Sequence, residues 1–145
     1  MKKIITLLLI LLAGCTTLEV AEAPAPPPTE AEVIAASEAE SWTYTCTILS
    51  NLLGYDGCAQ IEAPYVVWTQ ATRAFGAYGA YVPGEPHILV DPQGDHIWTT
   101  VIHEMAHYVL YWNSIDDRCK SEEVARYVAG QSDPTWRIRY GCEKT

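Results

Sequence analysis

The 145-residue chain is short of positive charge. It has 9 lysines and arginines against 18 aspartates and glutamates, which gives a formal net charge of −9. Binding to nucleic acid requires a positively charged stripe facing the phosphates, and this sequence has none, so we expect no nucleic-acid partner. The longest predominantly apolar run covers only residues 4–13, with Thr6 as its one polar residue. It is too short for a helix that spans a bilayer.

That apolar run belongs to an export signal. Lys2 and Lys3 precede it, as the charged residues of a secretory signal peptide do. Residues 12–15 are Leu-Ala-Gly-Cys and resemble the lipobox of bacterial lipoproteins. The resemblance implies that residues 1–14 are removed and that Cys15 is lipidated. Because Thr16 is not aspartate, it also favours the outer membrane, so we expect a lipid-anchored protein of the bacterial envelope that faces the periplasm or the exterior.

No pair of cysteines has C-x-x-C spacing, so the sequence does not favour a cysteine-held metal cluster. Four cysteines remain after Cys15, and an even number in an exported chain indicates disulfides, for which three connectivities exist. We favour Cys46–Cys58 and Cys119–Cys142, because these pairings close short loops. The second bridge would tie the segment before residue 121 to the C-terminus.

The chain divides into a tether and one domain. Residues 15–40 are rich in Ala, Pro and Glu, with prolines at positions 24 and 26–28, and such a segment cannot bury a core. We therefore expect an extended tether up to residue 40. Residues 41–145 then form one small domain, of the size at which disulfides add useful stability.

A strong helix pattern covers residues 95–113. The segment has no Gly or Pro, and its apolar residues recur at spacings of three, four and seven. Asp95 stands at the expected N-cap position after a turn signal at residues 92–94, and Asn113-Ser114 offers a stop. We expect this helix to form the centre of the domain.

Inside this helix, His103, Glu104 and His107 form the pattern H-E-x-x-H. Residues four apart share a helix face, so both imidazoles can reach one metal ion with Glu104 beside it. The pattern could instead be two surface histidines that bind nothing, or part of a structural zinc site. A structural site is closed by four protein ligands and has no use for Glu104, so the pattern favours an open, catalytic metal.

A second helix is expected over residues 121–130, with Ser121 as its cap, Gly130 at its end, and Glu122 and Glu123 in its first turn. Either glutamate could supply a third metal ligand. Either could also do no more than complement the helix dipole.

The downstream Glu-x-x-Ala at Glu122 and Ala125, together with H-E-x-x-H, resembles the gluzincin group of zinc metallopeptidases. The resemblance implies a Zn²⁺ ion held by His103, His107 and Glu122, with Glu123 as the fallback ligand. A metzincin site would need a third histidine at position 113, where this chain has Asn.

The chain departs from the gluzincin pattern at Arg126, where many members have an aspartate that orients a zinc histidine. Another acceptor must then orient it, such as a backbone carbonyl, Asp116 or Asp117.

Three strands are expected ahead of the H-E-x-x-H helix, at residues 65–69 and 86–91 and, more weakly, at 77–82. The fold class is thus α+β: a zincin-like domain in which a short sheet packs on the H-E-x-x-H helix and a second glutamate-bearing helix. By resemblance, an edge strand of this sheet pairs with an extended peptide or protein substrate.

The expected activity is zinc-dependent hydrolysis of peptide bonds, with a zinc-bound water that Glu104 activates. The oxyanion needs a further donor, and no single residue stands out among the candidates Tyr108, Tyr111, Tyr127, Tyr140 and His87. The alternative function is a non-catalytic, zinc-containing envelope lipoprotein that acts as a protein-binding module, which would leave Glu104 without a task. A metal-free structural lipoprotein would leave both histidines unexplained.

Overall fold

The computed structural model describes residues 30–131 and 135–142, with side chains from residue 37 onward. The expected signal peptide, Cys15 and most of the expected tether lie outside these ranges. Within the ranges, no helix combines the length and the apolar character that crossing a membrane requires.

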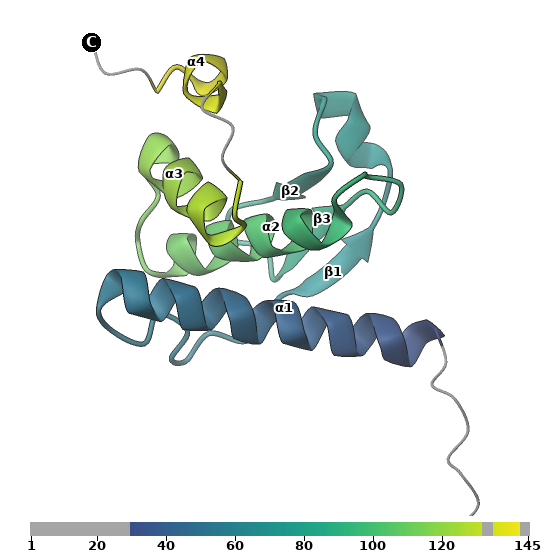
Figure 1. Ribbon diagram of the computed structural model, residues 1–145, viewed down its shortest axis with the longest axis horizontal. Coiled ribbons are helices and arrows are strands. Elements are labelled where there is room, and N and C mark those ends of the chain that lie inside the picture. Colours follow the sequence, from purple (N-terminus) through teal and green to yellow (C-terminus); the bar gives the residue numbers. More distant parts are fainter. Residues whose placement is uncertain (1–29, 132–134, 143–145) are drawn as a thin grey trace, which may run out of the picture.

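The described chain has a mixed α+β fold, as predicted (Figure 1). The three predicted strands and the two predicted helices are confirmed. A long helix precedes them in the chain and a short helix follows them. The elements in chain order are α1 (Glu30–Leu53), β1 (Tyr65–Trp68), the 3-10 helix η1 (Ala71–Phe75), β2 (Gly79–Tyr81), β3 (His87–Val90), α2 (Ile97–Trp112), α3 (Arg118–Val128) and α4 (Trp136–Tyr140).

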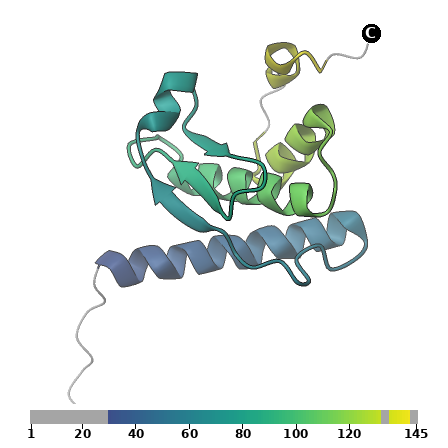
Figure 2. The same ribbon diagram turned by 180° about the vertical axis from the view of Figure 1, so that it is seen from behind.

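The strands form one small sheet with the order β1-β3-β2. Strand β3 lies in the middle, parallel to β1 and antiparallel to β2. Strand β2 is therefore an edge strand, and it packs against α2. Seen from behind, the sheet covers one side of α2, while α1 and α3 lie along its other sides (Figure 2).

Helix α2 is the centre of the core. Helices α1 and α3 and strands β2 and β3 all pack against it. Its residues 101–106 are buried without interruption. Full burial of one large apolar side chain contributes roughly 1.5–3 kcal/mol. The largest fully buried apolar side chains are Leu49, Ile88, Val90, Met105, Val109, Leu110 and Val128.

Helix α1 corrects the expected end of the tether, because residues 30–40 are helical instead of extended. The prolines end at Pro28, and the Ala and Glu residues that follow have high helix propensity. From Ser41 onward, Ser41, Thr45 and Leu49 recur every four residues and are completely buried. This packing against α2 stabilises a helix that continues back through the exposed residues 39 and 40.

Two predicted helix caps are wrong. The first bond of α2 runs from the backbone N–H of Thr100 to the carbonyl of His96, so His96 and not Asp95 is the N-cap. In α3, Asp117 is the N-cap and its carboxylate accepts the backbone N–H of Lys120 at 2.7 Å. Because this cap lies four residues earlier than expected, Ser121 is inside the helix. Glu122 and Glu123 consequently lie beyond its first turn.

The predicted helix ends are confirmed. Asn113 is the C-cap of α2. Gly130 follows the end of α3 with a φ of 67°, a left-handed conformation that glycine adopts without steric cost.

Both predicted disulfides are confirmed. Cys46–Cys58 joins α1 to the loop before β1, with a Cα–Cα distance of 5.7 Å. Cys119–Cys142 joins α3 to the short segment just after α4, with a Cα–Cα distance of 5.5 Å. Both separations lie in the usual range for disulfides. The second bridge therefore ties the C-terminal helix to the helix that carries Glu122.

An ion pair fastens the segment between β1 and β2 to the end of β3. The guanidinium of Arg73 in η1 donates to the completely buried carboxylate of Asp91, which also accepts the backbone N–H of Gln93 at 2.9 Å. The hydrogen bond from Arg73 lowers the pKa of Asp91, although burial opposes the change. The charged form of Asp91 is thus the one that the fold stabilises.

This pair makes the stability of the fold depend on pH. A carboxyl whose pKa is lower in the folded chain than its usual 3.8 stabilises the fold above that pH. The contribution is lost as the pH falls through the lowered pKa. We expect Asp91→Asn to lower the Tm at neutral pH, and the difference from the wild type to shrink as the pH falls from about 5 to about 2. Circular dichroism melts measure this difference, with the exposed Asp95→Asn as the control. A difference that stays constant with pH would contradict the assignment.

Candidate metal centre

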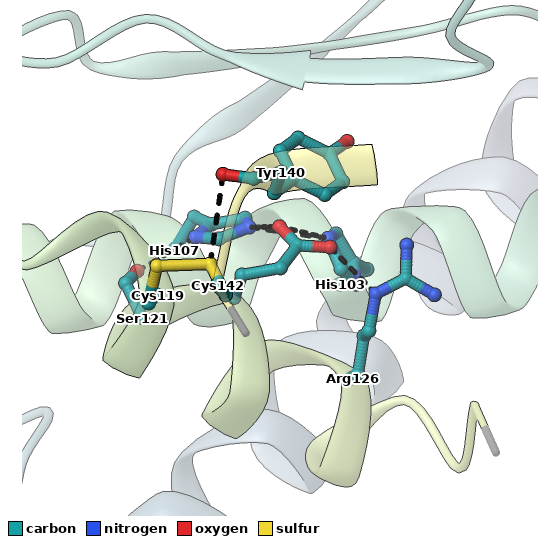
Figure 3. Close-up of polar contacts among 8 residues, drawn as sticks. His103, His107, Cys119, Ser121, Arg126, Tyr140 and Cys142 are labelled. Atoms are coloured by element: carbon teal, nitrogen blue, oxygen red, sulfur yellow. Dashed lines mark hydrogen bonds and ion pairs between the residues drawn. A yellow bond between two sulfur atoms is a disulfide. The ribbon is translucent and has the colours of Figure 1, made fainter. Parts of the chain in front are cut away.

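Three donor atoms converge between α2 and α3 (Figure 3). Nε2 of His107 lies 3.1 Å from Nε2 of His103 and 3.1 Å from Oε2 of Glu122. The third separation, from His103 Nε2 to Glu122 Oε2, is 3.6 Å. The two histidines share one face of α2 because they are four residues apart. The described chain thus brings together a His-His-Glu group that could hold a metal ion.

These separations fit a tetrahedral metal centre. Zinc binds imidazole nitrogen and carboxylate oxygen at about 2.0–2.2 Å, so two ligand atoms of a tetrahedron lie about 3.3–3.6 Å apart. The observed 3.1, 3.1 and 3.6 Å are close to that spacing. The side chain of Glu122 is only 7% exposed. A buried carboxylate requires nearby positive charge, which Arg126 supplies at Oε1 of Glu122 and a metal ion would supply at Oε2.

Ser121 orients one of the histidines. Its Oγ lies 2.8 Å from Nδ1 of His107, so a His107 that donates from Nδ1 turns its Nε2 lone pair toward Glu122. The expected acceptors do not have this role: Asp117 caps α3, and Asp116 is an exposed residue of the cleft wall. Nδ1 of His103 is buried and has no hydrogen-bond partner among the described residues.

Arg126 holds the other oxygen of Glu122. Its Nε donates to Oε1 at 2.6 Å, which leaves Oε2 for the histidines. Burial alone would raise the pKa of Glu122, but hydrogen bonds and charge interactions with His103 and His107 outweigh it, so the pKa lies well below its usual value. The residue at which the chain departs from the gluzincin pattern therefore directly contacts Glu122, the expected third ligand.

Glu123, the fallback ligand, lies outside the centre. Its side chain is 59% exposed, and its Oε1 accepts a hydrogen bond from Arg137 at 2.5 Å. Adjacent residues of a helix point in directions about 100° apart, so only one of the two glutamates can face α2. The structure selects Glu122.

Glu104 is buried beside the histidines, against the edge strand β2. Burial raises the pKa of its carboxyl, and the nearby His103 and His107 oppose this. The approach of β2 is so close that a Cβ at Gly79 would lie 2.8 Å from Cγ of Glu104 and 2.5 Å from Cγ2 of Thr100. Because glycine has no Cβ, residue 79 allows β2 to pack this closely against Glu104, beside the candidate metal centre.

A cleft opens over the centre and has two branches. The larger, of about 610 Å³, is lined by His103, Glu104, His107 and Glu122, and it extends past Tyr81, Pro83, Tyr111 and Ile115 to Asp116 and Arg118; we call it the larger branch. The smaller, of about 210 Å³, also reaches His103 and Glu104; we call it the arginine branch, lined further by Tyr78, Thr100, Arg126, Gln131, Arg139 and Tyr140. The centre thus lies at the floor of a cleft that extends to both sides.

Of the five expected oxyanion donors, the structure places two in the cleft and three elsewhere. Tyr111 lines the larger branch and Tyr140 lines both branches. Tyr108 is buried and donates to the carbonyl of Glu62 at 3.0 Å. Tyr127 is exposed, and His87 stacks on Tyr65 at the start of β3. Only Tyr111 and Tyr140 remain candidates, because only these two are placed in the cleft.

Sequence reasoning missed the roles of Ser121 and Arg126. Ser121 was expected to cap the helix. Arg126 was considered only as a departure from the family pattern, which has an aspartate at that position. A spacing signal existed: Ser121 and Arg126 flank Glu122 at positions −1 and +4, and the i,i+4 pair of Glu and Arg is a usual helix contact. The serine contact crosses to another helix and had no local signal.

Comparison with known proteins identified no relative of this chain. The chain matches no protein-family model, no curated protein and no solved structure.

The geometry distinguishes the two adjacent glutamates as metal ligands. We expect Glu122→Gln to weaken zinc binding at least about 100-fold, the upper end of what the loss of an outer partner of a ligand costs. Glu123→Gln is the matched control and should bind zinc like the wild type. Competition with a chelating dye measures both affinities. Equal losses in the two variants would contradict the assignment of Glu122.

The close approach of β2 to Glu104 predicts a cost for any side chain at position 79. We expect Gly79→Ala to destabilise the metal-free chain by about 1–3 kcal/mol, because the added methyl overlaps Thr100 and Glu104. Zinc affinity should change by less than about threefold, since the three ligand side chains do not contact the new methyl. Urea unfolding in the presence of a chelator measures the stability. A variant as stable as the wild type would show that β2 can shift freely.

Proposed function

We propose that the chain is a zinc-dependent hydrolase of peptide bonds, with His103, His107 and Glu122 as zinc ligands and Glu104 as the general base. One observation carries the proposal: three donor atoms, two of them on buried residues and one on the half-buried His107, converge at near-tetrahedral spacing beside the buried carboxylate of Glu104, which is not part of the group. A carboxylate beside three ligands has a use in an open metal site and none in a closed one.

The number of ligands supports an open site. Among the described residues, the metal-binding group contains three side chains, and no fourth His, Cys, Asp or Glu joins it. Structural zinc sites are usually closed by four protein ligands, whereas catalytic sites keep one position for water or substrate. The neutral-nitrogen and oxygen ligand set is one that zinc prefers.

A zinc ion at this site would supply a Lewis acid that polarises the scissile carbonyl and makes water acidic near neutral pH. Glu104 would accept a proton from the attacking water and pass it to the leaving amine. Its raised pKa, which follows from burial, suits a group that must both accept and return a proton. Of the five residues considered as oxyanion donors, Tyr111 and Tyr140 have hydroxyls in the cleft walls and would be the candidates to stabilise the developing oxyanion.

The cleft suits an extended peptide. Strand β2 is an edge strand, and its residues Gly79, Ala80 and Tyr81 line the cleft beside Glu104. An edge strand offers backbone N–H and C=O groups to which an extended peptide can add as a further strand. Such binding holds the backbone of the substrate next to the metal centre with little demand on its side chains.

We further propose that the domain is related to the gluzincins. Support comes from the order of the parts: a small sheet with an edge strand beside the cleft, a helix with His103, Glu104 and His107, and a later helix with Glu122. Ser121, which contacts His107, has the orienting role that an aspartate has in many gluzincins, while Arg126 holds Glu122.

The test is the effect of Glu104→Gln on hydrolysis. The wild-type chain should bind one equivalent of zinc and cleave members of a broad peptide library, and His103→Ala should lose the metal. Glu104→Gln should keep zinc but lose activity by about 10²–10⁴-fold, because the amide cannot accept the proton. Glu123→Gln, which removes one carboxylate on the outer face of α3, is the matched control.

Zinc analysis by mass spectrometry and cleavage analysis of the library measure the two properties separately. A chain without stoichiometric zinc would overturn the proposal. A zinc-loaded chain in which Glu104→Gln changes nothing would indicate the non-catalytic binding module instead.

A further inference from the structure

One continuous segment of the chain lines the cleft from the arginine branch to the larger branch. Residues 76–79 line the arginine branch, and residues 79–81 and 83 line the larger one. The described residues that line both branches are Gly79, His103, Glu104 and Tyr140. The metal centre thus lies where the two branches meet, and the segment around β2 continues past it on both sides.

The hydrogen bonds of the sheet show which way the backbone groups of β2 point. The N–H of Asp91 donates to the carbonyl of Tyr78 at 2.7 Å. These two residues continue the antiparallel register of β2 and β3. In an antiparallel ladder, residues that bond to the partner strand alternate with residues whose N–H and C=O point away from it. Gly79 and Tyr81 are therefore the residues of β2 whose backbone groups face its free edge.

Two further contacts agree with this direction. Val90 lies opposite Gly79, and its carbonyl accepts the N–H of Thr69 on the other side of the sheet at 2.8 Å. At the free edge, burial raises the pKa of Glu104, and the backbone N–H of Tyr81 is close enough to its carboxylate to oppose that rise. The free backbone groups of β2 thus open toward the metal centre.

The walls of the cleft suit the middle of a peptide chain better than its end. A peptidase that trims termini has to stop the chain beside the metal and to pair the charge of the terminal amine or carboxylate. Here the cleft continues past the centre in both directions. In the larger branch, Asp116 and Arg118 have opposite signs and together favour neither terminus. In the arginine branch, Nε of Arg126 is already bonded to Glu122 at 2.6 Å.

We propose that the cleft binds an internal stretch of an extended peptide, which crosses the metal centre along the free edge of β2, so that the protein cleaves bonds inside polypeptides and does not trim their ends. The inference rests on the proposed peptide hydrolysis and names its substrate class. The substrate backbone exchanges hydrogen bonds with Gly79 and Tyr81, and the residues on either side of the scissile bond occupy the two branches. Because these contacts are made with backbone groups, they hold unfolded segments of many sequences.

A scan of N-methylated peptides tests the pairing with β2. N-methylation removes one backbone donor, so we expect it to weaken binding by about tenfold or more at two positions that are two residues apart, and by much less at the position between them. Fluorescence anisotropy with the zinc-loaded Glu104→Gln chain measures this binding without turnover. Equal losses at adjacent positions would overturn the proposal, as would the absence of a loss at every position.

A series of peptides with both ends blocked tests internal cleavage. We expect the zinc-loaded wild-type chain to cut such peptides into two fragments. The value of kcat/KM should rise as residues are added on either side of the cleaved bond, until both branches are filled. Unblocking either end should change kcat/KM by less than about fivefold, the effect of an exposed charge pair. Mass spectrometry identifies the products, and release of single terminal residues or a strict need for a free terminus would overturn the proposal.

Gln131 tests whether the substrate reaches the arginine branch. It lines that branch and is not part of the metal-binding group. Gln131→Ala should lower the ratio of kcat/KM between long peptides and peptides truncated on that side by about three- to tenfold. Gln70→Ala removes the same amide at the exposed start of η1, outside both branches, and is the matched control. A ratio that Gln131→Ala leaves unchanged would contradict a substrate that fills both branches.

Binding and cleavage together separate this proposal from the proposed activity. The alternating loss of binding, in a chain whose wild type cleaves nothing, would support the binding mode and overturn the hydrolase. Cleavage from the ends of peptides, or cleavage without the alternating pattern, would overturn this inference alone. The absence of both the pattern and the cleavage would overturn the two proposals together.

Discussion

Helix α2 is enclosed on almost every side, and this enclosure constrains the rest of the fold. Elements α1, α3, β2 and β3 all pack against it, so even its polar side chains are withdrawn from water. A buried polar group is tolerated only where it finds a partner. Ser121 is the partner of His107 Nδ1. Glu122 lies against the Nε2 atoms of both His103 and His107. These polar contacts therefore help to fix the position of α3, together with its buried apolar residues.

A connected series of contacts leads from the end of the described chain to the metal centre. The disulfide and the ring of Trp136 hold α4 against α3, the guanidinium of Arg126 lies over that ring, and its Nε donates to Glu122. Glu122 in turn faces both histidines. Each step is a covalent bond, a cation–π contact or a charge-assisted hydrogen bond, which are the stronger of the side-chain interactions. Trp136 of α4 is thus connected to Glu122, the candidate third ligand, through a single intervening side chain, that of Arg126.

Sequence patterns were informative where a single element determines the outcome. The periodicity of residues 95–113 predicted α2, and β-branched runs predicted the strands. The favoured disulfide pairing is confirmed as well. The predictions failed where the outcome depends on contacts outside the predicted segment. Asp117, and not Ser121, is the N-cap of α3. Packing from Ser41 onward stabilises α1, which extends back through residues assigned to the tether. The bond from Ser121 to His107 joins two helices, so no local pattern could reveal it. Glu122 was preferred over Glu123 from the family pattern, and the geometry of the helix explains why only one can face α2.

The Cys119–Cys142 bridge also determines how the cleft can be entered. Cys142 lies two residues after Tyr140, and two residues of extended chain reach about 7 Å, so an intact bridge keeps Tyr140 near the start of α3. The bridge thus holds Tyr140, which lines both branches of the cleft, close to the helix that carries Glu122. The same covalent link that stabilises the domain therefore also fixes one wall of the cleft.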